Sequence, residues 1–390
     1  MALLEYPLSY ESFCCVGAPC EDSCCEGWDI EVDDVSYYRY MVLPGEYGKS
    51  VRARCEDEAD GTHAFRVRKD GRCPFLQDDR RCEMILRIGE DFLCETCMEF
   101  PRYYNGQDPY YQMDLSLSCP EACRMFFFDP APEVFVRRDV GSLGGPLYRA
   151  VEPQLAFGPK RDPEDYRISA HDGGLTDQQL MKSQKIACSA ADWLDGQALL
   201  QDAADGQAGK RFRRILRERD EMLKMLSDPM LSFEECFFRL RPDRPYKVDN
   251  ETILQMAEQF ESLDLSWEQE ILKLKQNINS IKKDDISALY KDTELSGFYK
   301  KLAAYLVFRY ALDAFYQENS ASDDCPEEKF LIADSMTMVQ KGLHLLLLLC
   351  AAEKKTAGGI FDRDGLSRTA HLFSKEVEHS ERNIHLLLQT

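Results

Sequence analysis

Residues 14–28 read CCVGAPCEDSCCEGW, and this stretch opens a cysteine-rich region that extends to Cys123. Most of the 16 cysteines of this 390-residue chain lie in that region: Cys14, Cys15, Cys20, Cys24, Cys25, Cys55, Cys73, Cys82, Cys94, Cys97, Cys119 and Cys123. The others stand far apart in sequence typical of helices, where a cysteine is most often a small buried hydrophobe: Cys188, Cys236, Cys325 and Cys350. The dense cluster therefore needs its own chemical explanation.

Two chemistries place cysteines this densely in a chain, namely disulfide bonds and metal ligation. The first residues, MALLEYPLSYESF, have an early Glu5 and lack the basic start and the apolar core of a secretory signal. We therefore expect a cytoplasmic protein, and a reducing compartment disfavours disulfides. Metal ligation is the favoured interpretation, because soft thiolates select zinc, iron–sulfur clusters or copper(I).

The spacing of the cysteines excludes two common metal-binding frames. No two pairs make the C-x2-C plus C-x2-C frame of a zinc ribbon. The iron–sulfur pattern C-x3-C-x2-C starts at Cys20 and again at Cys119. It fails both times, because Gly27 and Phe126 stand where the third cysteine would be. The ligands must therefore converge from several loops, and the fold itself assembles the site.

The adjacent pair Cys24 and Cys25 cannot easily bind one metal in the same way. Either one of them ligates while the other packs, or each serves a different centre. Arg102 follows Cys97 closely, and we expect its charge to neutralise a thiolate-rich cluster electrostatically.

Several strings of the chain carry a resemblance to a known family. In the first third they are Cys20-Glu-Asp-Ser-Cys-Cys-Glu-Gly-Trp28, Asp33, Cys73-Pro-Phe-Leu, Cys82, Gly89-Glu90, Thr96-Cys97, Pro101-Arg102 and Leu117-Ser-Cys-Pro-Glu121. Farther along they are Tyr305-Leu-Val-Phe-Arg-Tyr310 and Phe373-Ser-Lys-Glu-Val-Glu-His-Ser-Glu-Arg-Asn383. Together they resemble the flagellin lysine-N-methylase family, which carries a cysteine cluster of a zinc- or iron-chelating type. Residues 131–295 add little to the resemblance.

The resemblance implies an enzyme that transfers a methyl group from S-adenosylmethionine to the ε-amine of flagellin lysines. It also implies an oxygen-sensitive iron–sulfur cluster, of the 4Fe-4S type, with zinc as the alternative metal. Carried over position by position, the metal ligands would be Cys20, Cys24, Cys25, Cys73, Cys82, Cys97 and Cys119. One such cluster usually takes four cysteines. Some of the seven are therefore structural, or there are two centres.

The composition is that of an ordinary globular protein, and its net charge limits the classes of partner that it can bind. The net charge of −21 argues against nucleic-acid binding, which needs clustered Lys and Arg. It favours acidic faces that keep the protein in solution, with attraction of a lysine-bearing partner as the weaker interpretation. The most apolar run, Leu343–Ala352, is too short to span a membrane and predicts a buried helix. We therefore expect no integral membrane segment, while peripheral membrane association stays open.

The predicted fold is mainly α, with an irregular cysteine-rich metal-binding domain followed by an α-helical domain. Residues 1–130 form the first domain, in short turn-rich segments broken by Gly and Pro. Residues 131–175 are a linker or irregular connection, in which the glycine-rich 141–145 is a turn. Residues 176–390 form the helical domain, where Thr176 to Gln179 has capping-box spacing. The expected helices run near 176–202, 208–227, 250–280, 296–317, 327–353 and 364–388.

Methylating a lysine requires a base, because the protonated amine has no lone pair and its unperturbed pKa is about 10.4. The last predicted helix places acidic, basic and imidazole side chains on one face at intervals of three or four residues: His371, Lys375, Glu378, His379 and Arg382. Glu378 and His379 are the candidate catalytic residues, as acceptors of the lysine proton. The alternative interpretation is a solvated face with ordinary Glu–Arg pairing. No glycine-rich methyltransferase loop is evident, so no residue is assigned to S-adenosylmethionine.

Tyrosines concentrate in the first domain, and they either cover the cluster or form a cage for an alkylated amine, with packing favoured. The leading hypothesis is a flagellin-directed protein-lysine N-methyltransferase. One alternative is a non-enzymatic zinc- or iron–sulfur-binding protein with a helical partner-binding domain. Another is an electron-transfer protein with a reversible cluster near its surface.

Overall fold

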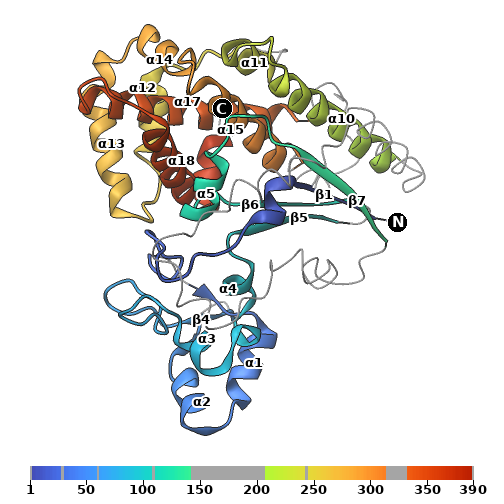
Figure 1. The fold of residues 1–390 in the computed structure, drawn as a ribbon, viewed down its shortest axis with the longest axis vertical. Coiled ribbons are helices and arrows are strands. Elements are labelled where there is room, and N and C mark those ends of the chain that lie inside the picture. The colour runs from blue at the N-terminus through green and yellow to red at the C-terminus, as the bar shows by residue number, and fades with distance from the viewer. Residues whose placement is uncertain are drawn as a thin grey trace.

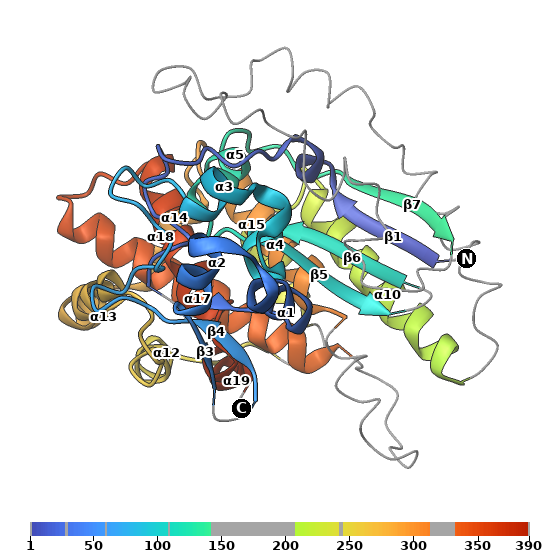
Figure 2. The ribbon, with the colours of Figure 1, turned by 90° about the horizontal axis from the view of Figure 1, so that it is seen from below.

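The computed structural model describes residues 2–27, 30–58, 61–107, 110–141, 207–241, 245–312 and 332–388. Figure 1 shows a small lobe at the bottom, a sheet beside the middle of the molecule and a mass of helices above. Figure 2, seen from below, shows the small lobe lying across the helices, with α10 running along the sheet. Several predicted features lie outside the described residues: the 131–175 connection beyond Gly141, the helix 176–202, Cys188 and Cys325.

The larger sheet has the strand order β5-β6-β1-β7. β1 (Ala2–Pro7) pairs antiparallel with β7 (Phe135–Gly141) and parallel with β6 (Tyr110–Leu115). β5 (Arg102–Gln107) joins β6 as an antiparallel neighbour. The strands contain the aromatic and branched residues that pleated surfaces favour. The sheet therefore brings the first residues of the chain next to residues that follow the cysteine-rich region.

A buried ionic network fastens this sheet to α10 (Gln207–Ser227). Glu5 on β1 is fully buried and accepts hydrogen bonds from Arg219 at 2.5 Å, from Arg137 at 3.0 Å and from the Tyr110 hydroxyl. Burial alone would raise the pKa of Glu5, but Arg137 and Arg219 outweigh it and lower the pKa to about 2. Glu5 is therefore an ionised structural carboxylate that ties β1, β6 and β7 to one helix.

The small lobe spans the segment between the first cysteines and β5. Its sheet has the order β2-β4-β3, built from β2 (Ile30–Glu31), β3 (Cys55–Asp57) and β4 (His63–Phe65). Around it lie α1 (Asp34–Val42), α2 (Gly45–Arg52), α3 (Glu83–Ile88), η2 (Glu90–Phe92) and α4 (Glu95–Glu99). Asp33 caps α1, because its side chain accepts from Ser36 N at 2.9 Å. A separate hydrophobic core fills this lobe, and several cysteines belong to it.

The helical part packs around two long helices, α15 (Ser296–Tyr310) and α17 (Ala333–Thr356), which are buried along most of their length. The other described elements are η1 (Leu8–Ser12), α5 (Pro120–Phe126), α11 (Phe233–Arg239), α12 (Asn250–Ala257), α13 (Leu265–Asn277), η4 (Ile278–Ser280), α14 (Lys283–Tyr290), α18 (Arg363–Val377) and α19 (Glu381–Leu388). Residues 343–352 are all buried, as the sequence predicted. α17 is apolar and long enough to cross a membrane, but 94% of its most apolar window is buried within the protein.

The mainly α fold with an irregular cysteine-rich N-terminal region is confirmed, while the sheets were not predicted. Two predicted helices are each broken in two. The helix predicted over 250–280 ends at Ala257, and Asp264 caps a new one by accepting from Ser266 N. The domain boundaries stay a prediction. The packing shows, however, that the main core includes Leu3 and Tyr110 beside the helices.

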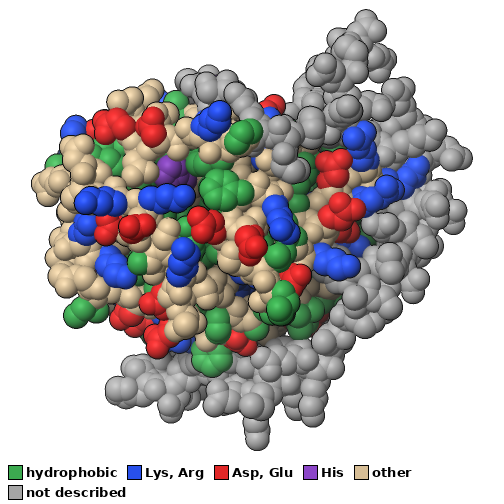
Figure 3. All heavy atoms as spheres, turned by 90° about the horizontal axis from the view of Figure 1, so that it is seen from above, with side chains coloured by type: hydrophobic (Ala, Val, Ile, Leu, Met, Phe, Trp, Pro, Cys, Tyr) green, Lys and Arg blue, Asp and Glu red, His purple; other side chains and the backbone are tan. Residues whose placement is uncertain are grey.

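On the face shown in Figure 3, basic and acidic side chains are interspersed and neither sign forms a large patch. The described part of this face therefore offers no continuous basic surface of the kind that phosphate backbones need.

Candidate functional site

The strings that carry the family resemblance are far apart in the sequence but meet in the structure. Tyr305 on α15 donates to Glu378 Oε2 at 2.6 Å, and Leu117 N–H donates to Tyr305 Oη at 3.4 Å. Arg309, one turn farther along α15, forms ion pairs with Asp114 on β6 and with Glu378. The chain therefore brings β6, α15 and the end of α18 to one junction, directly before Cys119.

Arg309 is the buried centre of this junction. Only 2% of its side chain is exposed, and the rings of Tyr103 and Tyr305 lie 4.4 Å and 4.9 Å from its guanidinium carbon. Burial alone would lower the pKa of Arg309, but the Asp114 carboxylate raises it above its usual value. Tyr103 thus packs on the structural arginine, in agreement with the packing interpretation of the tyrosines.

Glu378 and His379 lie where one predicted helix is interrupted. α18 ends at Val377, and Ser380 begins the next helix by accepting from Asn383 N at 3.1 Å. The two candidates therefore occupy a corner between α18 and α19 rather than one face of a continuous helix. Glu378 is 2% exposed, and within the described residues its Oε1 has no hydrogen-bond partner while its Oε2 is held by Tyr305 and Arg309.

His379 contacts the segment directly before Cys119. Its Nε2 lies 2.7 Å from Ser118 Oγ and 3.4 Å from Ser116 Oγ, and its ring is 6.0 Å from that of Phe100. Burial lowers the pKa of His379 to about 4, and the positive charges of Arg309 and Lys375 act in the same direction. The imidazole is therefore neutral near pH 7, with one ring nitrogen able to accept a proton.

A second set of contacts ties the cysteine-rich loop to α18. Asp22 Oδ2 lies 3.0 Å from His371 Nε2 and 2.8 Å from Lys375 Nζ, and Lys375 also reaches Asp264 at 2.9 Å. His371 Nδ1 lies 3.0 Å from the carbonyl oxygen of Leu117. Burial would raise the pKa of Asp22, but the hydrogen bonds from His371 and Lys375 lower it to about 2. His371 therefore links the Cys20–Cys25 loop to the segment before Cys119.

One group of thiols lies in the small lobe. Cys73 is buried in its core, and Cys25, Cys82 and Cys97 pack against that core. Burial raises the pKa of Cys73 to about 12 and that of Cys82 to about 11, and an ionised Cys25 would raise both further. Cys94, which is not among the seven predicted ligands, shares a hydrogen bond with Cys97 that lowers its own pKa.

Another group of thiols lies at the junction. Cys119 is buried at the start of α5, and burial raises its pKa to about 12, with Cys15 and Cys20 adding to the rise. The Cys24 thiol donates to Cys25, which raises the pKa of Cys24 above its usual value, and Cys15 and Cys119 raise it further. The seven predicted ligands therefore divide between two neighbouring groups.

The donor chemistry of both groups suits a soft metal, since thiolates select zinc, iron–sulfur clusters or copper(I). Thiols whose pKa burial has raised need a bound cation to ionise at neutral pH. Within the parts of the chain that the structure describes, no three His, Cys, Asp or Glu side chains are arranged around a single point as one bound ion needs. The thiols of each group therefore lie near one another, but they are not arranged to bind a single metal ion.

Arg102 packs against aromatic rings, and its expected neutralisation of a thiolate cluster stays a prediction. Its guanidinium stacks 5.3 Å from the ring of Phe13 and 5.9 Å from that of Tyr10. Arg80 is a cation that acts on one of the predicted ligands, and it lowers the pKa of Cys20 against the rise caused by burial. The sequence gave no signal for Arg80, because it belongs to the turn between Cys73 and Cys82 rather than to a family-like string.

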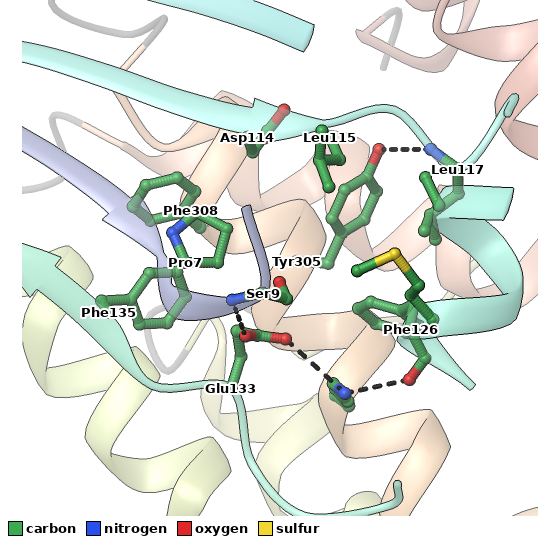
Figure 4. A pocket seen from close by; sticks show the side chains of 13 residues that line it. Pro7, Ser9, Asp114, Leu115, Leu117, Phe126, Glu133, Phe135, Tyr305 and Phe308 are labelled. Atoms are coloured by element: carbon green, nitrogen blue, oxygen red, sulfur yellow. Dashed lines mark hydrogen bonds and ion pairs between the residues drawn. The ribbon is translucent and has the colours of Figure 1, made fainter. Parts of the chain in front are cut away.

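A cavity of about 30 Å³ lies between the sheet and α15. Figure 4 shows it lined by Phe135, Phe308 and Tyr305, with Glu133 joined to Ser9 N and to Lys301. Lys301 Nζ also donates to Phe126 O at 2.9 Å. A cavity of this size holds about one water molecule. It cannot hold a methyl donor, since ligand pockets occupy roughly 300–1,000 Å³.

Comparisons with known proteins agree with the resemblance found in the sequence. Curated proteins named Lysine-N-methylase, from Salmonella typhimurium and Salmonella choleraesuis, are each 25% identical to this chain over 275 residues. The match covers 67% of this chain and 62% of theirs. A "Flagellar biosynthetic protein FliU" from Salmonella muenchen is 29% identical over 132 residues, which is 32% of this chain and 76% of that protein. No family model and no solved structure matches. The predicted resemblance is thereby confirmed at the level of these homologues.

Proposed function

We propose that this relative of the lysine-N-methylases is itself a protein-lysine N-methyltransferase that acts on flagellin. It would move a methyl group from S-adenosylmethionine to the lysine ε-amine, with a cysteine-ligated iron–sulfur cluster as its metal group. The Salmonella relative named for flagellar biosynthesis supports flagellin as the partner. The enzyme would act in the cytoplasm, before flagellin is exported.

The observation that supports this proposal is that the family-like strings, which are far apart in the sequence, lie together in the structure. Asp22, Leu117, Arg309, Lys375 and Glu378 come from four separated strings and contact one another directly or through one side chain. Random similarity in separated strings would not select residues that meet at one place. The junction also adjoins the thiols of Cys20 and Cys119, so the metal group and the polar site would be neighbours.

Proton removal is the step that this site can supply. The ε-nitrogen lone pair forms the new C–N bond as the S–CH3 bond breaks, S-adenosylhomocysteine leaves, and the surplus proton must go to a base. His379 is the candidate for this role, because it is neutral at pH 7, although its low pKa makes it a weak base that would need the lysine amine to bind largely unprotonated. Glu378 is held by Arg309 and Tyr305, so we propose that it positions the corner that carries His379.

The metal group would be held by the junction and small-lobe thiols. When bound, it would supply either a coordination point for the methyl donor or a cross-link between the loops. This chain's own residues would orient the loops around it, with Asp22 anchoring the Cys20–Cys25 segment to α18. The acidic chain, with a net charge of −21, would attract a lysine-bearing partner at long range.

The test is an anaerobic incubation of the purified protein with flagellin and methyl-labelled S-adenosylmethionine, followed by peptide mass spectrometry. We expect label on flagellin lysines. His379→Gln should reduce the rate roughly 10²–10⁴-fold, the usual contribution of a general base. His385→Gln is the matched control, because His385 is exposed on α19, and its rate should equal that of the wild type. No label on lysine, with the metal content intact, would instead support a non-enzymatic metal-binding protein.

A further inference from the structure

The helix α1 presents a stripe of apolar side chains to solvent. Val35, Tyr38 and Val42 are 54%, 69% and 59% exposed. They follow one another at intervals of three and four residues, so they lie on one face of the helix over about two turns. The other side of α1 is packed, since Ser36 and Tyr40 are buried. Single exposed apolar side chains are ordinary, whereas a contiguous group at the surface marks an interaction site.

Carboxylates border this α1 stripe at both ends. Asp34 is exposed and stands four residues before Tyr38, on the same face of the helix. Asp57, also exposed, lies 2.8 Å from Nδ1 of His63, and Asp34 lies 3.8 Å from Nε2 of the same ring. At the other end of α1, Glu46 in the first turn of α2 is exposed. The surface is therefore apolar along the stripe and acidic at its ends.

The cations of α1 and α2 are each engaged within the small lobe. Lys49 pairs with Glu46 at 2.6 Å. Arg52 donates to backbone carbonyl oxygens at the end of α1. Arg39 donates to Asp91 O at 2.6 Å. The charges that would meet a partner at the start of the α1 stripe are therefore those of carboxylates, and electrostatic complementarity calls for a partner that brings lysine or arginine.

α1 is fastened to the element that leads to the candidate site. The two carboxylate oxygens of its cap, Asp33, accept from Ser36 N and from Glu95 N at the start of α4, each at 2.9 Å. Directly after α4 stands Phe100, whose ring lies 6.0 Å from that of His379. In Figure 1, α4 lies between α1 and the larger sheet. A partner seated on α1 would therefore be held at a defined position relative to His379.

We propose that the α1 stripe is a docking surface for the protein substrate, and that its occupant is an amphipathic helix with lysines beside its apolar face. α1 presents side chains rather than backbone groups, and a face two turns long matches a second helix packed across it. The acidic ends favour lysine and repel the anionic headgroups of a membrane. The inference rests on the proposed function for the identity of the substrate, and it places part of substrate selection away from the reacting lysine.

The first experiment titrates purified flagellin into the full chain, purified without oxygen, in the absence of a methyl donor. Tyr38→Gln/Val42→Gln removes the apolar surface and keeps residues that suit a helix. We expect the Kd for flagellin to rise at least about tenfold, because truncating a tyrosine at an interface commonly costs that much. Leu265→Gln/Leu272→Gln is the matched control. It removes two exposed apolar side chains from one face of α13 and should leave the Kd unchanged.

A second variant tests the charge at the start of the stripe. Asp34→Asn should weaken flagellin binding less than the double variant does, and it should reduce the rise of the Kd with added salt, because charges at the rim of an interface act at long range and are screened. In the methyl-transfer assay, Tyr38→Gln/Val42→Gln should raise the KM for flagellin and leave kcat unchanged, since docking contributes equally to the ground state and the transition state.

An unchanged Kd in the Tyr38→Gln/Val42→Gln protein, or an equal loss in the α13 control, would overturn the docking surface while flagellin methylation by the wild type upheld the proposed function. Absence of any flagellin binding by the wild type would also overturn it. Weaker binding by the stripe variant, in a protein that transfers no methyl group, would support the surface and refute the enzyme. A wild type that sediments as a dimer and a stripe variant that sediments as a monomer would assign the stripe to a second copy of this chain, against the proposal.

Discussion

Asp22 is the residue that ties the cysteine-rich loop to α18, and its charge state should be visible in acid. Its pKa is lowered from 3.8 to about 2, so its ionised form stabilises the folded state above pH 4, and this contribution is lost as the pH falls toward 2. Asp22→Asn should lower the free energy of unfolding by about 1–2 kcal/mol at pH 7, allowing for its partial exposure. Urea unfolding at pH 7 and at pH 2.5 measures the difference.

The control for this substitution is Glu21→Gln, an exposed neighbour whose loss should change little. An Asp22→Asn protein that unfolds like the wild type at pH 7 would mean that the contacts with His371 and Lys375 add nothing to stability.

His379, like Asp22, makes the protein less stable as the pH falls, because its folded-state pKa is lowered from 6.5 to about 4. Between pH 6.5 and pH 4 this imidazole binds a proton in the unfolded chain but not in the folded chain. The free energy of unfolding therefore falls as the pH drops. At pH 5 the loss amounts to about 2 kcal/mol relative to pH 7.5. His379→Gln should therefore lose about 2 kcal/mol less stability between these two pH values, measured by urea unfolding. An unchanged pH slope would show that the imidazole is solvated.

At the scale of elements, Arg309 joins β6, α15 and the corner after α18. Truncating one partner of a buried ion pair leaves the other charge uncompensated, which costs about 3–5 kcal/mol. Arg309→Met should therefore lower the free energy of unfolding by about that amount. Arg66→Met is the matched control, because Arg66 pairs with Glu56 while 62% of its side chain is exposed. We expect a change of about 0–1 kcal/mol for that surface pair. Equal small effects would mean that Asp114 and Glu378 do not depend on Arg309.

The elements that form because of neighbouring residues in the sequence were predicted correctly. The helix expected over 208–227 is present as α10, since charged and apolar residues alternate there at helical spacing. The break after Val377 was missed, because the Ser380 cap competes with a pattern that reads as continuous. The larger sheet was also missed. β1 pairs with strands more than 100 residues away, and its six residues carry no strong alternation.

In the candidate site, too, the features set by nearby residues were predicted, and those set by contacts between distant segments were not. Cysteine spacing predicted metal ligation, and the family-like strings named most of the thiols that the structure gathers. The sequence could not say which thiols group together, because the grouping depends on the Cys25–Cys73 backbone pairing and on the His371 contacts with Asp22. Ser118 was likewise missed as a contact of His379, since the two are 261 residues apart.

At the scale of the whole molecule, the two lobes differ in what holds them together. The helical part shares one large apolar core with the main sheet. The small lobe has its own core, in which Val51, Phe65 and Met84 pack among cysteines. Cys73 lies in that core and Cys25, Cys82 and Cys97 pack against it, and the proposed function makes these thiols metal ligands. The proposed metal would therefore contribute more to the folding free energy of the small lobe than to that of the helices.

If the proposed metal is bound, its removal should therefore unfold the two parts separately. Hydrogen exchange followed by mass spectrometry, with and without a chelator, would measure protection along the chain. We expect amides in β4 and α3 to exchange at least about tenfold faster after chelation, since losing a structural metal exposes the segments it holds. Those of α15 and α17 should be unchanged, because none of the proposed ligand thiols belongs to either helix. A variant lacking the ligand cysteines is the control, and chelator should not alter its exchange. Equal acceleration in α17 would mean that the lobes unfold as one unit, and the metal would then stabilise the whole chain.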